Sequence, residues 1–145
     1  MTHPAIAQYL LALLCGIQGL ATLAIDLRRT HATNPEWTRH ARYHVVWQAI
    51  GTALGSFPAM ALVLSPGPLQ ADRFYLAALL AGLPMLGFLG ALAGRRLYGG
   101  ALSDPNGIPP VRIAAFGSVL HIDLNLVAEV LALSLLVGTV ALFGN

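Results

Sequence analysis

The chain has 145 residues, of which 57% are hydrophobic and only 10% are charged, and its mean hydropathy is +0.70. A soluble domain usually carries about a quarter charged residues, so this composition indicates an integral membrane protein. The net charge of +2 is too small to predict a nucleic-acid partner. All cationic side chains are arginines, which excludes lysine-dependent Schiff-base and P-loop chemistry, and the single cysteine excludes redox pairs and thiolate metal clusters.

Four stretches are long and apolar enough to be spanning helices, each of which needs ~20 apolar residues. They cover residues 4–25, 44–64, 74–93 and 113–143. Proline- and glycine-rich segments separate them, and the runs lack the alternation of a β-barrel. We therefore predict an all-α fold, with residues 1–145 forming one four-helix transmembrane bundle of a multi-pass protein in the plasma (inner) membrane.

The arginines predict how this bundle is oriented. Seven of the eight lie in or beside the first and third connections, residues 26–42 and 95–112, and only Arg73 lies beside the second. Loops that are rich in arginine stay in the cytoplasm. Both long connections are therefore expected in the cytoplasm and both termini on the non-cytoplasmic side.

Ionisable residues at the cytoplasmic ends of the helices are the first candidates for a functional site, because such groups are costly in a membrane. Asp26 ends the first helix and His121 is expected at about the same depth in the fourth. His40 and His44 begin the second helix four residues apart, so they share a face that could hold a metal ion. Gln48 continues this stripe toward the bundle interior.

The predicted fourth helix carries the deepest polar groups. His121, Asn125 and Glu129 follow four-residue steps and would share one face, whereas Asp123 would lie about 200° away from His121. Glu129 would lie ~12 Å deeper than His121 by helix rise, where it could relay protons or contact a substrate.

The first connection contains the pattern Thr30-His31-x-x-Asn34-Pro35-x-Trp37-x-x-His40-Ala41-x-x-His44. This pattern resembles one in small bacterial four-helix membrane proteins. The resemblance covers only the first connection and the opening of the second helix, and it implies the topology rather than an activity. The pattern places His31 on a short ordered loop that could fold over the mouth of the bundle.

These residues lead to the hypothesis of a membrane-embedded, metal-dependent enzyme, an oxidoreductase or oxygenase, that acts on a small lipophilic substrate entering from the bilayer. Nitrogen and oxygen ligands without thiolates suit iron, manganese or zinc and disfavour Cu(I) or an iron–sulfur cluster. Of the three metals, iron is the one expected. The expected metal ligands are His40, His44, His121, Asp26 and His31. The expected catalytic groups are Glu129, Asp123 and Asn125, with Asp123 also a possible carboxylate ligand. The expected substrate contacts are Arg39, Arg42 and Gln48, where an arginine could hold an anionic group.

Three alternatives remain open at this point. The first is a metal-independent isomerase or hydrolase that uses acid–base catalysis. The second is an electron-transfer protein that binds haem between a histidine of the second helix and His121. The third is a non-enzymatic accessory or transporter subunit. Glycine-rich faces on the first and third helices could also pack against a second copy. The enzyme hypotheses require His44 and His121 to converge at the inner rim of the bundle.

Overall fold

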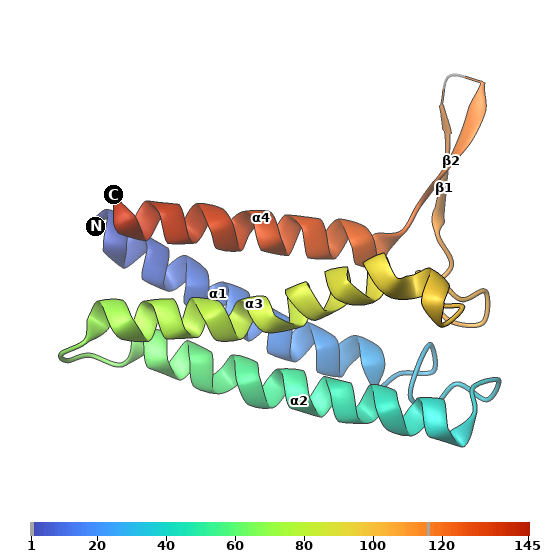
Figure 1. Cartoon of the computed structure of the whole chain (residues 1–145), viewed down its shortest axis with the longest axis horizontal. Coiled ribbons are helices and arrows are strands. Elements are labelled where there is room, and N and C mark those ends of the chain that lie inside the picture. Colours follow the sequence, from blue (N-terminus) through green and yellow to red (C-terminus); the bar gives the residue numbers. More distant parts are fainter. Residues whose placement is uncertain (1, 116) are drawn as a thin grey trace.

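The computed structural model describes residues 2–115 and 117–145, in which four long helices form an up-and-down bundle (Figure 1). The helices are α1 (His3–Asp26), α2 (Arg39–Leu64), α3 (Gln70–Gly94) and α4 (Leu124–Gly144). α1 packs against α2 and α4, and α3 packs against the same two helices, which closes the ring. All four are long and apolar enough to cross a membrane. The prediction of four apolar helices of spanning length, packed as a bundle, is therefore confirmed.

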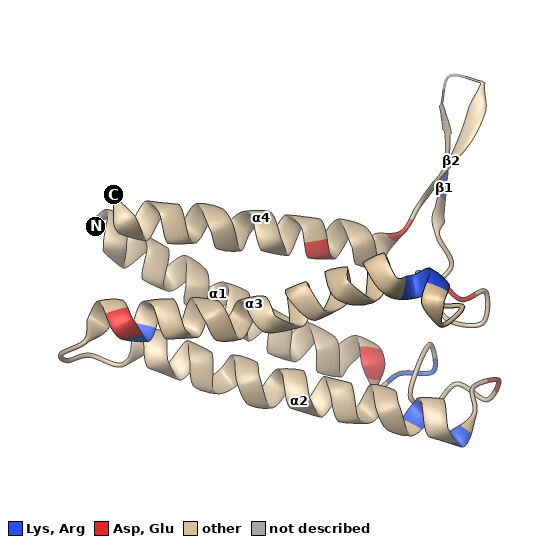
Figure 2. Cartoon of the chain, viewed as in Figure 1, with Lys and Arg blue, Asp and Glu red and all other residues tan. Residues whose placement is uncertain are grey.

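The two ends of the bundle differ in length of loop and in charge. Both termini and the short turn between α2 and α3 lie at one end, and the two long connections lie at the other (Figure 1). We name these connections the first loop, residues 27–38, and the third loop, residues 98–110. A short 3-10 turn, η1 (Arg95–Leu97), precedes the third loop. Basic residues gather at this second end, which we call the arginine-rich end, and only Arg73 lies at the opposite end (Figure 2).

The fourth apolar segment differs from the prediction of one continuous helix over 113–143. Its first part forms an antiparallel hairpin of β1 (Val111–Ala115) and β2 (Ser118–Ile122), and only residues from Leu124 onward are helical. β-Branched residues are frequent in this part and favour strands. Gly117, with a φ of +75°, adopts the left-handed conformation that a tight turn needs.

Asp123 marks the point where the strand ends and α4 begins. Its side-chain Oδ1 accepts a hydrogen bond of 3.0 Å from the Leu126 amide, so the residue is the N-cap of the helix. The remaining helix has 21 residues. At ~1.5 Å per residue this length is still enough to span about 30 Å of hydrocarbon.

The apolar core lies in the half of the bundle nearer the termini. Phe74 and Phe143 stack there with ring centroids 3.8 Å apart, and Leu11, Met85 and Leu136 are buried around them. Toward the arginine-rich end, α3 has no buried residue beyond Met85 and α4 has none before Leu136. Pro84 lies inside α3 at this level, where a proline breaks the hydrogen-bond ladder of a helix. The helices therefore pack less closely where the long loops join them.

A polar side chain links three helices within the bundle. The Gln18 amide nitrogen donates to the Ala81 carbonyl oxygen at 3.1 Å, and its oxygen accepts from the Ser56 hydroxyl at 3.1 Å. The neighbouring Gly19 is buried, and a Cβ there would lie 3.0 Å from the ring of Phe57. Gly19 on α1 is therefore used for close packing inside the bundle. On α3, a Cβ at Gly87 or Gly90 would meet open space.

Candidate functional site

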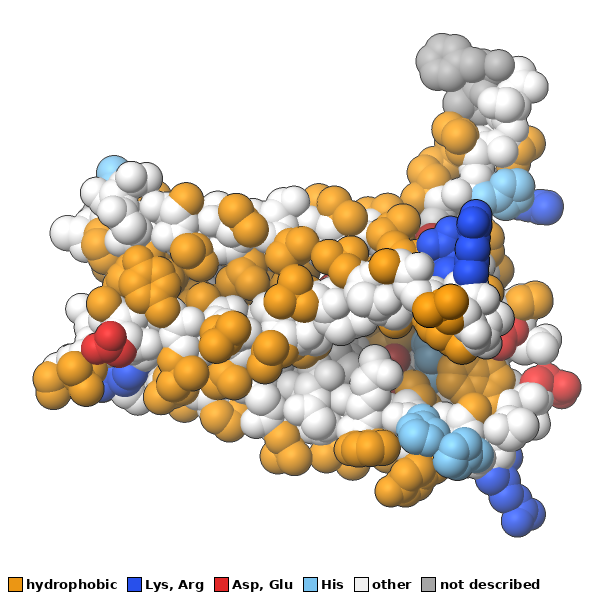
Figure 3. Space-filling model, viewed as in Figure 1, with side chains coloured by type: hydrophobic (Ala, Val, Ile, Leu, Met, Phe, Trp, Pro, Cys, Tyr) orange, Lys and Arg blue, Asp and Glu red, His pale blue; other side chains and the backbone are white. Residues whose placement is uncertain are grey.

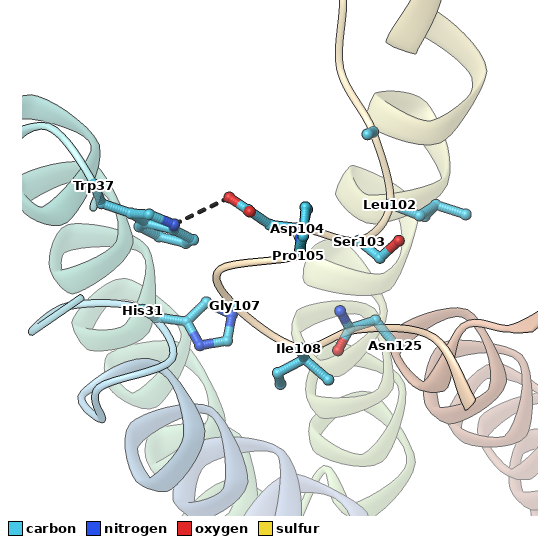
Figure 4. A pocket seen from close by; sticks show the side chains of 10 residues that line it. His31, Trp37, Leu102, Ser103, Asp104, Pro105, Gly107, Ile108 and Asn125 are labelled. Carbon is cyan, nitrogen blue, oxygen red and sulfur yellow. Dashed lines mark hydrogen bonds between the residues drawn. The ribbon is translucent and has the colours of Figure 1, made fainter. Parts of the chain in front are cut away.

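A pocket of about 460 Å³ lies at the arginine-rich end, where the first loop, the third loop and the start of α4 meet (Figure 4). Its polar and apolar lining residues come from segments that are far apart in the sequence. They are His31, Trp37, Ala101, Leu102, Ser103, Asp104, Pro105, Gly107, Ile108 and Asn125.

Asn34 joins the two loops that form the pocket. Its side chain is buried, with 2% of its surface exposed. The amide nitrogen donates to the backbone oxygens of Asn106, at 2.6 Å, and Thr30, at 3.4 Å. The side-chain oxygen accepts from the Glu36 amide at 3.0 Å, which turns the chain at Pro35. Both ends of one buried amide group are therefore satisfied, one across the loops and one within the first loop.

Trp37 makes the second connection between the loops. Its indole nitrogen donates to Asp104 Oδ2 at 3.1 Å, which Figure 4 marks with a dashed line. Asp104 Oδ1 accepts from the Asn106 amide at 2.8 Å and so orders the turn that follows it. A Cβ at Gly107 would lie 3.2 Å from the Thr30 carbonyl oxygen, so the close approach of the loops favours glycine there. We call the contacts of Asn34 and Trp37 with the third loop the loop clasp.

His31 is the imidazole that the loop clasp places in the pocket. Its Nδ1 lies 2.9 Å from the Thr30 hydroxyl, and its ring packs edge-on against Trp37 with centroids 5.3 Å apart. Its Nε2 has no hydrogen-bond partner in the described part of the chain. Figure 4 shows the His31 ring and the Asn125 amide extending toward the third loop from opposite sides. The ring is therefore oriented by one nitrogen while the other is free to meet a ligand.

Asp26 adds a carboxylate beside this imidazole. It ends α1, is half-buried, and interacts electrostatically with His31. Its backbone oxygen accepts from the Ala32 amide at 2.9 Å, which holds the first loop against the end of α1. Three of the residues singled out from the sequence, Asp26, His31 and Asn125, are therefore gathered at or beside one pocket.

The histidines of α2 do not join this group. His40 and His44 are exposed, with their Nε2 atoms 3.0 Å apart. Gln48 is exposed too, and a Cβ at Gly51 would meet nothing within 4 Å, so the prediction that this stripe faces the bundle interior is wrong. The face of α2 that is buried instead carries the small residues Ala49, Ala53, Ser56 and Ala59.

His121 also lies elsewhere, because it belongs to β2 rather than to a helix. Its exposed side chain accepts a hydrogen bond of 3.3 Å from Arg112 Nε, its partner in the hairpin register. The predicted helical face shared with Asn125 and Glu129 is therefore wrong. Figure 3 shows the histidines of α2 and of the hairpin on separate parts of the surface. Neither the expected three-histidine ligand set nor the expected pair of haem ligands is formed by these residues. The enzyme hypothesis that required His44 and His121 to converge therefore fails in that form, and a catalytic site must be built from other residues.

No third metal ligand lies beside His40 and His44 in the part of the chain that the structure describes. Among residues 2–115 and 117–145, no group of three His, Cys, Asp or Glu side chains is arranged to hold a metal ion. Asp123 caps α4, which accounts for its position without a catalytic role.

Glu129 lies one turn beyond Asn125 on the stripe of α4 that continues to the buried Leu136. It is half-buried and has no hydrogen bond or ion pair among the residues described. Arg39 is exposed, and the buried Nε of Arg42 has no hydrogen-bond partner in the same residues. Neither arginine lines the pocket, so their expected contact with a ligand there is not supported by the geometry.

Sequence reasoning missed four residues that build the site or its support. Asn34 and Trp37 were noted only as members of the pattern in the first connection, but the Asn34 side chain joins the two loops and the Trp37 indole nitrogen donates to Asp104. Asp104 lies in the third connection, where no site residue was predicted, and Gln18 was given no role. A turn-forming Asp-Pro-Asn-Gly segment predicts a bend in the chain, but nothing in it indicates which other loop it contacts.

No protein-family model matches this chain, and comparisons with curated proteins and with solved structures give no match either. The site is therefore interpreted from its own geometry.

The loop clasp predicts that Asn34→Asp loosens the third loop. The substitution keeps the oxygen that faces the Glu36 amide, but it replaces the donor to the Asn106 carbonyl with a second oxygen. Leaving a buried polar pair unsatisfied costs roughly 1–3 kcal/mol. We expect faster amide hydrogen exchange over residues 103–108, measured by mass spectrometry in detergent.

Asn106→Ala is the matched control, because the Asn106 contact uses its backbone oxygen and its side chain is exposed. This variant should exchange as the unmodified protein does. Unchanged exchange in Asn34→Asp would contradict the loop clasp.

Proposed function

We propose that this chain is a multi-pass membrane protein that binds a small lipophilic molecule in the pocket at its arginine-rich end and acts on it by acid–base chemistry at His31. The observation that carries the proposal is the state of the His31 ring. One nitrogen is held by Thr30, while the other lies unbonded in a pocket lined from three segments. An oriented imidazole is the side chain most often used to move a proton in catalysis.

The pocket suits a ligand with a polar group on an apolar body. Its volume of about 460 Å³ is in the range of small-molecule sites, which run from roughly 300 to 1,000 Å³. Trp37, Leu102 and Ile108 offer apolar contact, and the Asn125 amide offers a donor and an acceptor for a carbonyl or hydroxyl group. The loose packing of α3 against α4 near this end supports entry of the ligand from the bilayer.

In this proposal His31 Nε2 removes a proton from the substrate, or from a water molecule that attacks it. The carboxylate of Asp26 stabilises the imidazolium ion that results, because opposite charges attract strongly where water is scarce. The imidazolium then returns the proton to a different substrate atom or to the leaving group. The cycle needs no oxidant or reductant, so the reaction class is an isomerisation or a hydrolysis.

The proton-transfer role predicts that a substrate gains label from heavy water. Purified protein in detergent would be incubated with a total bacterial lipid extract in D₂¹⁸O, and the lipids analysed by mass spectrometry. An isomerase leaves deuterium in its product and a hydrolase leaves ¹⁸O. We expect His31→Asn to reduce this labelling by roughly 100-fold or more, the size typical of a lost acid–base group.

His3→Asn is the control, since His3 lies in the first turn of α1 at the opposite end of the bundle, and labelling should be unchanged. Equal labelling with both variants would exclude His31. A lipid extract that acquires no protein-dependent label would instead favour the non-catalytic accessory role.

We also propose that the arginine-rich end faces the cytoplasm. The grouping of seven arginines at that end, against Arg73 alone at the other, supports this orientation.

Reporter fusions in a bacterial host test the orientation. Alkaline phosphatase fused after Asn145 should be active, and green fluorescent protein fused at the same point should not fluoresce. Fusions after Pro35 in the first loop should give the reverse pattern. Active phosphatase at Pro35 with inactive phosphatase at Asn145 would invert the proposed orientation.

A second candidate function is metal-dependent, and the His40–His44 pair favours it. Two ligands that occupy neighbouring positions on one metal ion have donor atoms roughly 3 Å apart. The two exposed Nε2 atoms share a hydrogen bond of 3.0 Å, and a metal ion that displaced its proton could take both as ligands. A metal held there would supply Lewis-acid or redox chemistry at the outer face of α2, away from the pocket.

Zinc titration of the purified protein tests this candidate. His44→Ala should weaken binding by roughly tenfold or more, because it removes half of the chelating pair. His121→Ala should leave the affinity unchanged, since the hairpin holds His121 elsewhere. Weaker binding in His121→Ala would instead support the three-histidine site predicted from the sequence.

A further inference from the structure

The hairpin of β1 and β2 has one face of large apolar residues, and its other face carries the Arg112–His121 pair beside the smaller apolar pair Ala114–Val119. Its register pairs Val111 with Ile122 and Ile113 with Leu120, and between these it pairs Arg112 with His121. Because neighbouring residues of a strand point to opposite sides, the apolar pairs share one face and the Arg112–His121 pair lies on the other. Leu120 is 53% exposed. An isolated two-stranded hairpin with an uncovered apolar face is marginally stable in water. The hairpin would therefore be stabilised if an apolar environment covered this face.

The hairpin lies at the end of the helix that would be most exposed to lipid, which places it near the membrane surface. It leaves the bundle at the start of α4 and extends across the direction of the helices, past α4 and away from the other three (Figure 1). α4 is the most apolar of the four helices and the least covered by its neighbours, so lipid would surround it. Its 21 residues are just long enough to cross the hydrocarbon layer. Asp123 therefore lies near the membrane interface, and the hairpin begins there.

The two faces of the hairpin match the polarity of that interface. In Figure 3 several hydrophobic side chains of the hairpin lie on the side toward α4, and a smaller hydrophobic area lies on the opposite side. A histidine and an arginine side chain lie on the opposite side, which faces away from the helices. Arg112 also joins Arg95 and Arg96 at this end, and basic residues near a membrane surface attract anionic lipids.

We infer that the hairpin is an anchor that lies along the membrane surface at the arginine-rich end. The face of Val111, Ile113, Leu120 and Ile122 rests on the lipid at the boundary between headgroups and acyl chains. The face of Arg112 and His121 remains in the headgroup and water layer. The inference concerns a different part of the molecule from the pocket, and it rests only on the proposed insertion of the four helices in a bilayer.

Site-directed spin labelling tests this placement in the whole protein. Single cysteines replace Leu120, on the apolar face, and Val119, its neighbour on the face of Arg112 and His121, in a Cys15→Ala background. The protein is reconstituted in vesicles of phosphatidylethanolamine and phosphatidylglycerol. Collisions with oxygen, which concentrates in lipid, are compared with collisions with a water-soluble nickel complex. We expect the oxygen-to-nickel ratio at Leu120 to exceed that at Val119 several-fold.

Two reference positions separate the ways in which the inference could fail. Leu131, exposed on α4, reports lipid, and Glu36, exposed in the first loop, reports water. A nickel-accessible label at Leu131 would show that the helices are not in the bilayer. A lipid-like Leu131 with a water-like Leu120 would overturn the anchor alone. A Leu120 label shielded from both reagents would also overturn it, because protein, such as a second copy, would then cover the hairpin.

Discussion

The buried amide of Asn34 is the contact on which the arrangement of the arginine-rich end depends. It bonds to the Asn106 carbonyl on one side and to the Glu36 amide on the other, and thus joins the two long loops. The indole of Trp37 adds a bond to Asp104. A buried polar group is costly unless its hydrogen bonds are made, so the loss of one loop would leave the Asn34 amide with an unsatisfied group. The His31 ring packs against Trp37, and its position follows from that contact.

The loop clasp is needed because the helices alone do not form a site. Their apolar core lies near the termini, and the Gln18 amide draws α1, α2 and α3 together within the bundle. Beyond Met85 in α3 and before Leu136 in α4, no side chain is buried. The space left there would be open to lipid and water without a cover. Close packing in one half and two joined loops over the other half together produce a pocket at the arginine-rich end.

The error in the fourth segment had the largest consequence for the site. Residues 113–143 contain enough apolar residues for a single long helix, and on that assumption His121, Asn125 and Glu129 share a face. The hairpin removes His121 from this face, while Asp123 starts the helix two residues later than His121. Hydropathy does not distinguish an apolar strand pair from an apolar helix. The excess length of the segment, more than the bilayer requires, was the signal that a second element was present.

Composition, segment length and the positions of the arginines were enough to predict four apolar helices and an end of the bundle rich in charge, because these properties depend on each segment alone. They were also enough to single out Asp26, His31 and Asn125. Only the tertiary structure showed that these three lie at or beside one pocket, and that His44 and His121 lie elsewhere. The direction of a side chain at a helix end depends on which face the neighbouring helices cover, and the pairing of two loops depends on contacts between residues distant in the chain. Neither is encoded in local periodicity.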